Sequence, residues 1–241
     1  MAEDEIRKHT KAAYKALRDK ERDWKHKLKD VLLEVLIIVF AVTISIWLHN
    51  WSEDIKDRKA EKEFLTGLKG DINADLVEMR SDKKFSEMGL AGVYYFEKVG
   101  SGQPLSKDSL NKYSWIFFAQ TQINPRISRF EALKGSGKLD IIEDKKLQYN
   151  IIELYQKNFP QIARMNGYMN VVIADKIDPY LGDTMELDSN GSMLNAEAIL
   201  RKSKMRILLL QAQGIKNSIK AYSDGIDKAN EVIKQIDEEL K

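Results

Sequence analysis

The sequence predicts an all-α protein in which a single N-terminal transmembrane helix continues into an elongated antiparallel helical bundle. Three observations predict this fold class. An apolar run long enough to cross a bilayer lies near the N-terminus, apolar residues after it recur at spacings of three and four, and only four prolines occur among the 241 residues. Such spacings place side chains on one face of a helix, and a low proline content permits long helices.

The composition argues against several classes of function. Lys and Arg number 39 against 37 for Asp and Glu, so the chain has no basic field with which to hold nucleic acid. It contains no cysteine, and its three histidines, His9, His26 and His49, all precede residue 50. The large C-terminal part therefore lacks the residues of Ser-His-Asp and Cys-His catalysis and of His-ligated zinc. We expect a non-enzymatic protein without a cofactor.

Residues 1–30 form a charged N-terminal arm, which we expect to be a cytoplasmic helix. Lys25, Lys27 and Lys29 beside Trp24 could contact anionic headgroups at the membrane face. A solvated charged helix fits the same residues, and the sequence leaves both interpretations open.

Residues 31–51 form the expected transmembrane helix. These 21 residues span about 31 Å as a helix, which matches the hydrocarbon thickness of a bilayer. Trp47 and Trp51 lie at the C-terminal end, where indoles favour the interface, and Glu34 lies one turn inside the other end, within snorkelling reach of headgroups. The run is apolar on every face and ends in bulky residues, which disfavours a soluble core helix and a cleaved signal peptide.

The basic residues on either side of the span predict its orientation. Six Lys and Arg residues lie in the fifteen positions before it, and four lie in the fifteen positions after it. Because cytoplasmic flanks carry the excess of positive charge, the N-terminus is expected in the cytoplasm and residues 52–241 in the periplasm.

Two stretches resemble a known family. Glu34, Asn50, Trp51 and Glu53 match the pattern of an uncharacterised family of single-span membrane proteins of Bacteroidota, in which a glutamate precedes an aliphatic run and an Asn-Trp-x-Glu exit. The segment Phe130 to Leu147 resembles a second family stretch, with an aromatic residue, Ala-Leu-Lys and Ser-Gly before a helix.

The chain departs from the family pattern at three positions of the first stretch. Ala41 replaces a central glycine, and His49 and Ser52 replace asparagines. The resemblance implies single-span topology and a location in the bacterial envelope, and together with the charge bias it leads us to expect the inner membrane. It implies no activity and no site residues.

Beyond the span, the sequence predicts successive helices separated by clear breaks. The first helix is expected to continue to the Gly100–Pro104 segment, and Asn124-Pro125 and Gly135–Gly137 end two shorter helical stretches. A long helix follows from Asp140–Glu143 and is expected to kink at Pro160.

The final helix, from about Ala196, carries the most regular apolar pattern of the chain. Spacings of four and three continue over more than four heptads, which indicates a coiled-coil seam. The seam could pack within the chain, which we favour, or against a second copy. The pattern consists of Leu208, Ala212, Ile215, Ile219, Tyr222, Ile226, Ala229, Ile233, Ile236 and Leu240.

A polar connection over residues 179–197 contains a weak metal-binding pattern. Glu186, Asp188, Asn190 and Glu197 follow the spacing of an EF-hand calcium loop with glycine at its sixth position. Position 1 is glutamate rather than aspartate, and position 9, Leu194, offers no side-chain oxygen. A turn built on Asn190 and its following glycine explains the same residues, and we favour the turn.

Two functions fit these features. The first is a non-enzymatic interaction or scaffold module displayed by a membrane-anchored envelope protein, with the bilayer and either a protein partner or a second copy as its partners. The second is a single-span sensor that binds a small ligand in the bundle. A dry core around Trp115 and Tyr155 would favour the scaffold, and an open pocket there would favour the sensor.

Overall fold

A computed structural model describes residues 7–8, 10–11, 14 and 24–241. The N-terminal arm expected over residues 1–30 lies largely outside the described residues. The chain divides into two compact units, an N-terminal unit, Met1–Ala60, and a bundle unit, Glu61–Lys241. The sequence placed this boundary after residue 51. The described part of the chain is all-α, as predicted, and its only strand-like pairing is one bridge between Leu187 and Met193.

The helix α2 (Trp24–Gly100) begins in the N-terminal unit and contains the apolar run. This stretch is long and apolar enough to cross a membrane, and none of its apolar window is buried in the structure. Its hydroxyls are satisfied by the helix itself, because Thr43 donates to the Val39 carbonyl at 2.7 Å and Ser45 to the Ala41 carbonyl at 2.8 Å. Hydroxyls bonded in this way add little cost in lipid.

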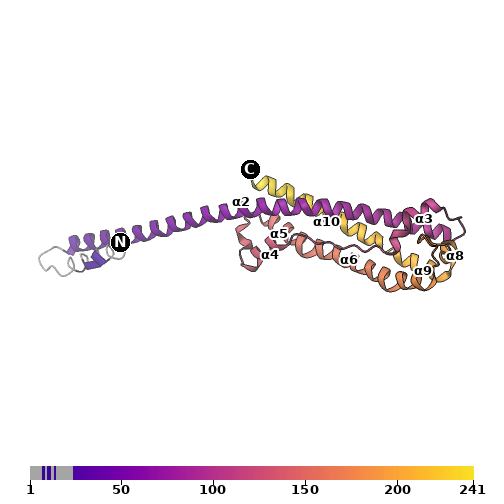
Figure 1. Cartoon of the computed structure of the whole chain (residues 1–241). Coiled ribbons are helices and arrows are strands. Elements are labelled where there is room, and N and C mark those ends of the chain that lie inside the picture. Colours follow the sequence, from indigo (N-terminus) through magenta and orange to yellow (C-terminus); the bar gives the residue numbers. More distant parts are fainter. Residues whose placement is uncertain (1–6, 9, 12–13, 15–23) are drawn as a thin grey trace. The chain divides into compact units, whose positions relative to one another are not determined.

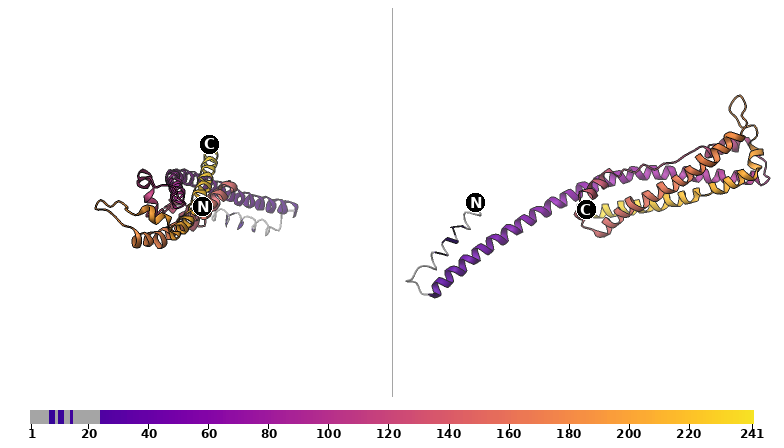
Figure 2. Two further views of the ribbon diagram at one scale, coloured as in Figure 1. Left: turned by 90° about the vertical axis from the view of Figure 1, so that its right-hand side faces the viewer. Right: turned by 90° about the horizontal axis from the view of Figure 1, so that it is seen from below.

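The bundle unit consists of the C-terminal part of α2 and the shorter helices that follow it (Figures 1 and 2). After α2, residues 101–144 form a segment of short helices and loops, and residues 145–184 form a second long helical rod. A short hairpin over residues 185–195 and three further helices complete the unit. The part of α2 in this unit, the rod of residues 145–184 and the last helix are called the three rods below. The elements are α3 (Lys107–Tyr113), η1 (Ser114–Phe117), α4 (Ser128–Gly135), η2 (Leu139–Ile141), α5 (Lys145–Glu153), η3 (Leu154–Asn158), α6 (Phe159–Val172), η4 (Ile173–Ile177), α7 (Asp178–Thr184), α8 (Ala196–Arg201), α9 (Ser203–Ala212) and α10 (Ile215–Glu239).

Polar contacts give the directions of the rods. Lys69 pairs with Asp237, and the Tyr222 hydroxyl donates to Asp82 at 3.2 Å, so α10 runs antiparallel to α2. The α5–α6 rod is antiparallel to α10 in turn, since Asn150 contacts Gln235 near one end and Asn166 contacts Tyr222 further along. The α10 rod is therefore antiparallel to both other rods, which run in the same direction as each other.

Buried apolar residues form two clusters along the bundle. One cluster lies between the three rods in the half of the bundle unit that is nearer Glu61. The helix α4 covers this cluster with Phe130. The other lies toward the Gly100 end of α2, where α3, α7, α8 and α9 close the bundle. The largest fully buried side chains are Leu65, Leu68, Ile72, Met79, Phe96, Phe130, Ile142, Leu147, Ile151, Leu154, Ile162 and Tyr222.

Two prolines are accommodated in the second rod by wider π turns. The turn η3 (Leu154–Asn158) precedes Pro160, and η4 (Ile173–Ile177) precedes Pro179. At the end of η3, the Phe159 N–H bonds to the Leu154 carbonyl, five residues back. Proline has no N–H and clashes with the preceding turn of an α-helix, and the extra residue of a π turn removes that conflict. The rod therefore continues through Pro160.

Candidate functional site

The expected seam on α10 packs inside the chain, but its most buried line is offset from the predicted one. Tyr222 and Ile236 are fully buried as expected, whereas Ile219, Ile226 and Ile233 are only half-buried. The deepest positions include Ala229, which belongs to the predicted apolar pattern, and two small residues that the pattern passes over, Ser218 and Gly225.

Close helix packing explains this offset. A Cβ at Gly225 would lie 2.9 Å from the Ile162 Cδ1 and 3.5 Å from the Met79 Sδ. Small residues at this line let α10 approach both other rods, and the branched residues beside it cover the edges of the contact. Among the other seam residues, Leu208 is buried, and Ile215 and Leu240 are half-buried.

The residues of the calcium-like pattern form a hairpin instead of a gathered ligand set. The Asp188 Oδ1 accepts the backbone N–H groups of Asn190 and Ser192, each at 2.8 Å, and Gly191 has a φ of 77°. These backbone bonds hold the pKa of Asp188 below its usual value. The described residues contain no group of three or more His, Cys, Asp or Glu side chains that could hold a metal.

The other two residues of the pattern lie apart from that turn. Glu186 is exposed, and its backbone N–H bonds to the Asn195 side chain at 3.0 Å. Glu197 belongs to α8 and pairs with Arg201, one turn further along the helix. The turn interpretation therefore accounts for the local geometry.

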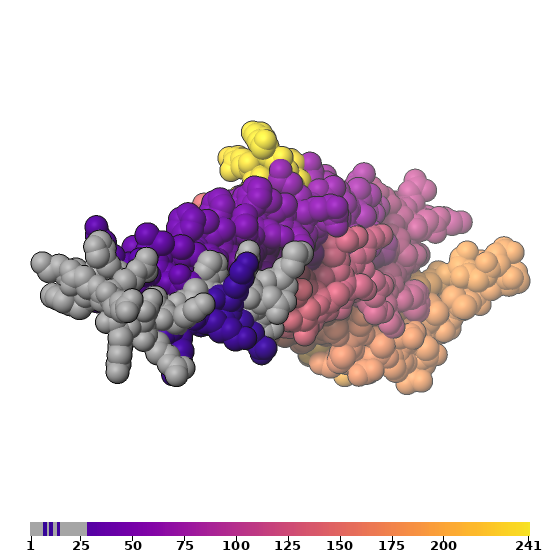
Figure 3. Space-filling view, turned by 90° about the vertical axis from the view of Figure 1, so that its left-hand side faces the viewer, coloured from indigo at the N-terminus to yellow at the C-terminus, as the bar shows by residue number. Residues whose placement is uncertain are grey.

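A groove of about 600 Å³ lies beside this hairpin, at the Gly100 end of the bundle unit. Residues from α3, the end of η1, the hairpin and α8 line it. Its apolar lining stays partly exposed, since Leu187 is 50%, Leu194 is 65% and Phe118 is 45% exposed. Figure 3 shows the hairpin, in orange, projecting from the surface. This groove was not predicted from the sequence, in which the leucines flanking the Asn-Gly turn are its only local signal.

The regions around Tyr155 and Trp115 are closely packed. Tyr155 stacks on Phe130 with ring centroids 4.6 Å apart and meets Phe159 edge-on at 5.2 Å. Its hydroxyl is buried without a hydrogen-bond partner in the described chain, and burial raises its pKa. Trp115 contacts Phe85 and borders a cavity of only about 30 Å³. That volume is comparable with one water molecule and well below that of a drug-sized ligand.

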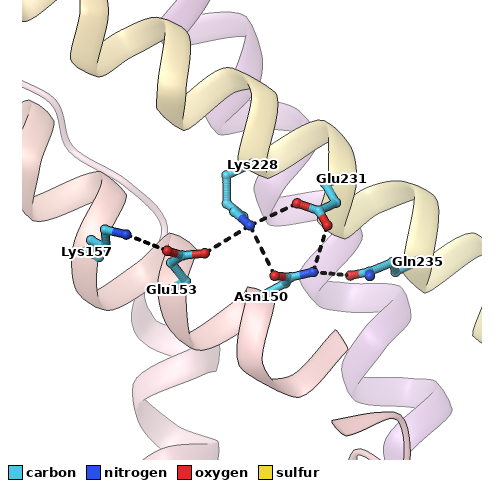
Figure 4. Close-up of polar contacts among 6 residues, drawn as sticks. All are labelled: Asn150, Glu153, Lys157, Lys228, Glu231 and Gln235. Carbon is cyan, nitrogen blue, oxygen red and sulfur yellow. Dashed lines mark hydrogen bonds and ion pairs between the residues drawn. The ribbon is translucent and has the colours of Figure 1, made fainter. Parts of the chain in front are cut away.

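A polar network joins α5 to α10 (Figure 4). Lys228 donates to Glu153 and Glu231, each at 2.9 Å, and to Asn150 at 3.1 Å. Asn150 in turn donates to Glu231 at 3.0 Å. The pKa of Glu153 is lowered by Lys157 and then Lys228, and the pKa of Glu231 is lowered chiefly by Lys228. The network provides hydrogen-bond partners for the buried Asn150 and links α5 to α10. It is called the clasp below.

The clasp predicts a pH dependence of stability. Because Glu153 and Glu231 have lowered pKa values in the folded state, their stabilisation is present above about pH 4.5 and is lost as the pH falls through the folded values. Lys228→Met should lower the free energy of unfolding by about 1–2 kcal/mol at pH 7. It should also reduce the fall in stability between neutral and acid pH, which is called the acid limb below. Urea denaturation between pH 7 and pH 3 measures both effects.

Lys234→Met serves as the control for this prediction. Lys234 lies on the same helix, is 78% exposed and pairs with Glu238 at 3.9 Å. Its replacement should change stability by less than about 0.5 kcal/mol and leave the acid limb as steep as in the original protein. An equal acid limb in Lys228→Met would contradict the assignment.

Residues 118–127 form an extended strap that is tied across α2 and α6. Buried Asp75, whose side chain is 2% exposed, accepts the Arg126 Nη1 at 2.7 Å and the Arg126 backbone N–H at 3.1 Å. Asn170 bonds both backbone groups of Thr121, at 3.1 and 2.9 Å. Burial raises the pKa of Asp75, against the lowering effect of Arg126. Two side-chain clamps thus hold a segment that has no helix of its own.

Removing the Asp75 clamp should loosen the strap. Asp75→Ala is expected to cost about 2–3 kcal/mol, because it deletes charge-assisted bonds and leaves the Arg126 backbone N–H without its acceptor. Glu78→Ala removes the other, half-exposed partner of Arg126 and should cost less than about 1 kcal/mol. Hydrogen exchange should accelerate over residues 119–128 only in the Asp75 variant.

The four span residues singled out from the sequence all lie on α2 in the N-terminal unit. Trp47 and Trp51 stack with ring centroids 6.2 Å apart, and Asn50 is exposed beside them. Glu34 lies sixteen positions before Asn50 and is partly covered. The tryptophan pair is an amphipathic group suited to a headgroup region.

Comparisons of the chain with protein-family models, with curated proteins and with solved structures found no match.

Proposed function

We propose that the chain is a single-span membrane protein whose bundle unit serves as a non-enzymatic interaction module of the bacterial envelope. The observation that carries the proposal is the groove beside the hairpin, with its partly exposed Leu187, Leu194 and Phe118. Apolar side chains gathered around a hollow on a protein surface are typical of a contact surface for a partner.

The placement in the membrane rests on α2. Its apolar window is unburied within the chain, so it has no protein core to cover it, and lipid is the environment that would do so. The excess of basic residues before the span supports a cytoplasmic N-terminus and a periplasmic bundle unit. The resemblance to the single-span family supports a location in the bacterial envelope.

The sensor remains the second candidate because of one observation. The groove beside the hairpin has a volume of about 600 Å³, which lies within the usual range of small-molecule sites. The region around Trp115, where an open pocket would have favoured the sensor, is closed. A ligand in the groove beside the hairpin would satisfy this alternative.

Site-specific photo-crosslinking in intact membranes tests the proposal. A photoreactive residue is placed at Leu194, in the groove, and in a matched variant at Ile207, which is 53% exposed on α9 and lies outside it. The proposal expects a discrete protein adduct from position 194 and none from position 207. Recovery of the lone monomer from both positions would contradict an interaction module.

A further inference from the structure

The two apolar clusters of the bundle unit are separated along its rods. On α2, the buried residues of the first cluster end at Met79, and those of the second cluster begin at Val93. On α6, the corresponding residues are Ile162 and Met169. The apolar core is therefore interrupted at the same level of both rods.

Buried polar residues, called the polar layer below, occupy that level. Ser86 on α2 and Ser218 on α10 are each 2% exposed, and Asn166 on α6 is 1% exposed. Asn166 donates to the Tyr222 hydroxyl at 2.7 Å, and that hydroxyl donates to Asp82 at 3.2 Å. These two bonds link all three rods and satisfy one part of the layer.

The hydroxyl of Ser218 is buried without a partner. Its Oγ makes no hydrogen bond to any group of the described chain. An unpaired buried polar atom is costly, and the great majority of such atoms in folded proteins bond to protein or to ordered water. Ser223, on the same helix, instead donates to the Ile219 carbonyl at 2.9 Å. Ser218 therefore lacks the kind of bond that the helix itself provides for Ser223.

The cavity of about 30 Å³ beside Trp115 adjoins this hydroxyl. Ser86, Thr121 and Ser218 contribute hydroxyl-bearing side chains to its lining. Asn170 also lines it and holds the strap there through both backbone groups of Thr121. A cavity can hold a water molecule when its volume exceeds about 10–15 Å³ and it offers the water about two to four polar partners. This cavity meets both conditions.

We propose that this cavity is an internal hydration site, in which one ordered water molecule bonds to the hydroxyls of Ser218 and Ser86 and completes the polar layer. The water joins α10 to α2 at the level where the two apolar clusters separate. Ala119 and Thr121 of the strap form one wall of the site. The site lies apart from the groove beside the hairpin, so the proposal goes beyond the interaction function and does not depend on it.

Solid-state NMR of the full chain in lipid vesicles tests the site directly. The serine side chains carry a ¹³C label, and magnetisation is transferred to them from water. We expect the buried Ser86 and Ser218 to receive this magnetisation as fast as exposed serines do. Ser218→Val fills the cavity and removes the hydroxyl, so it should abolish the transfer to Ser86. Ser223→Ala should leave the transfer to both serines unchanged, and far-UV circular dichroism should be the same for all variants.

The sign of a stability change gives a second test. If a water molecule bonds to the Ser218 hydroxyl, Ser218→Ala removes a partner of that water and should lower the urea midpoint of unfolding. If the hydroxyl is unpaired or bonds to its own helix, the same substitution should leave the midpoint unchanged or raise it. Ser223→Ala is the matched control and should not lower the midpoint. An undiminished midpoint in Ser218→Ala, no fast transfer to Ser218, or a transfer to Ser86 that persists in Ser218→Val each overturns the inference.

Discussion

The double substitution Ile38→Lys and Val42→Lys is expected to abolish stable membrane integration of the chain. Each charge near the middle of a transmembrane helix costs about 2.5–3.5 kcal/mol on insertion scales, so the pair should cost about 5–7 kcal/mol. The two positions lie one turn apart on α2, within the unburied apolar window. Both lysines would therefore enter lipid without a protein partner on the same chain.

Carbonate extraction of membranes measures this effect. The original protein should remain in the membrane pellet, and the double variant should move to the soluble or aggregated fraction. Val77→Lys with Leu210→Lys is the matched control, because these residues are 67% and 62% exposed in the bundle unit. The control should stay in the pellet. Extraction of the original protein by carbonate alone would refute the span.

Phe130→Ala is expected to lower the free energy of unfolding of the bundle unit by about 3–5 kcal/mol. Phe130 is fully buried and is the only buried residue of α4 (Ser128–Gly135). Its ring stacks on Tyr155 with an interplanar angle of 14°. Truncation would leave a cavity against Tyr155 and remove the anchor of a two-turn helix.

Urea denaturation followed by near-UV circular dichroism measures the loss. Tyr149→Ala is the control, since Tyr149 is 62% exposed on the adjacent helix α5 and should change stability by less than about 0.5 kcal/mol. Hydrogen exchange should also accelerate over residues 128–135 in the Phe130 variant. Equal stability of the two variants would show that α4 is not held by this ring.

The local patterns of the sequence were sufficient for most helices. The long α2, the break at Gly100 and the turn at Gly191 each follow from neighbouring residues, through apolar spacing, glycine at positive φ or hydrogen bonds within a few positions. The single helix expected from about Ala196 is instead divided into α8, α9 and α10. The expected kink at Pro160 depended on the same local reasoning. Local reasoning did not predict the π turn before Pro160. This turn accommodates the proline while Leu154 and Tyr155 stay buried, and their burial depends on distant parts of the chain.

The groove and the clamps required contacts between distant residues. Asp75 and Arg126 are 51 positions apart, and Asn150 and Glu231 are 81 positions apart. No periodic pattern links such pairs. In the sequence, Leu187 and Leu194 only flank a turn. They line a groove because α3 lies beside the hairpin in the tertiary structure.

By itself, the sequence determined the helical class, the candidate span and the position of the hairpin, because each depends on the composition, spacing or hydrogen bonding of residues that are neighbours along the chain. Only the tertiary structure decided which line of α10 is buried. Gly225 carries no apolar signal, yet its small size lets three rods pack closely, and the branched residues Ile219, Ile226 and Ile233 of the predicted seam are therefore left at the edges.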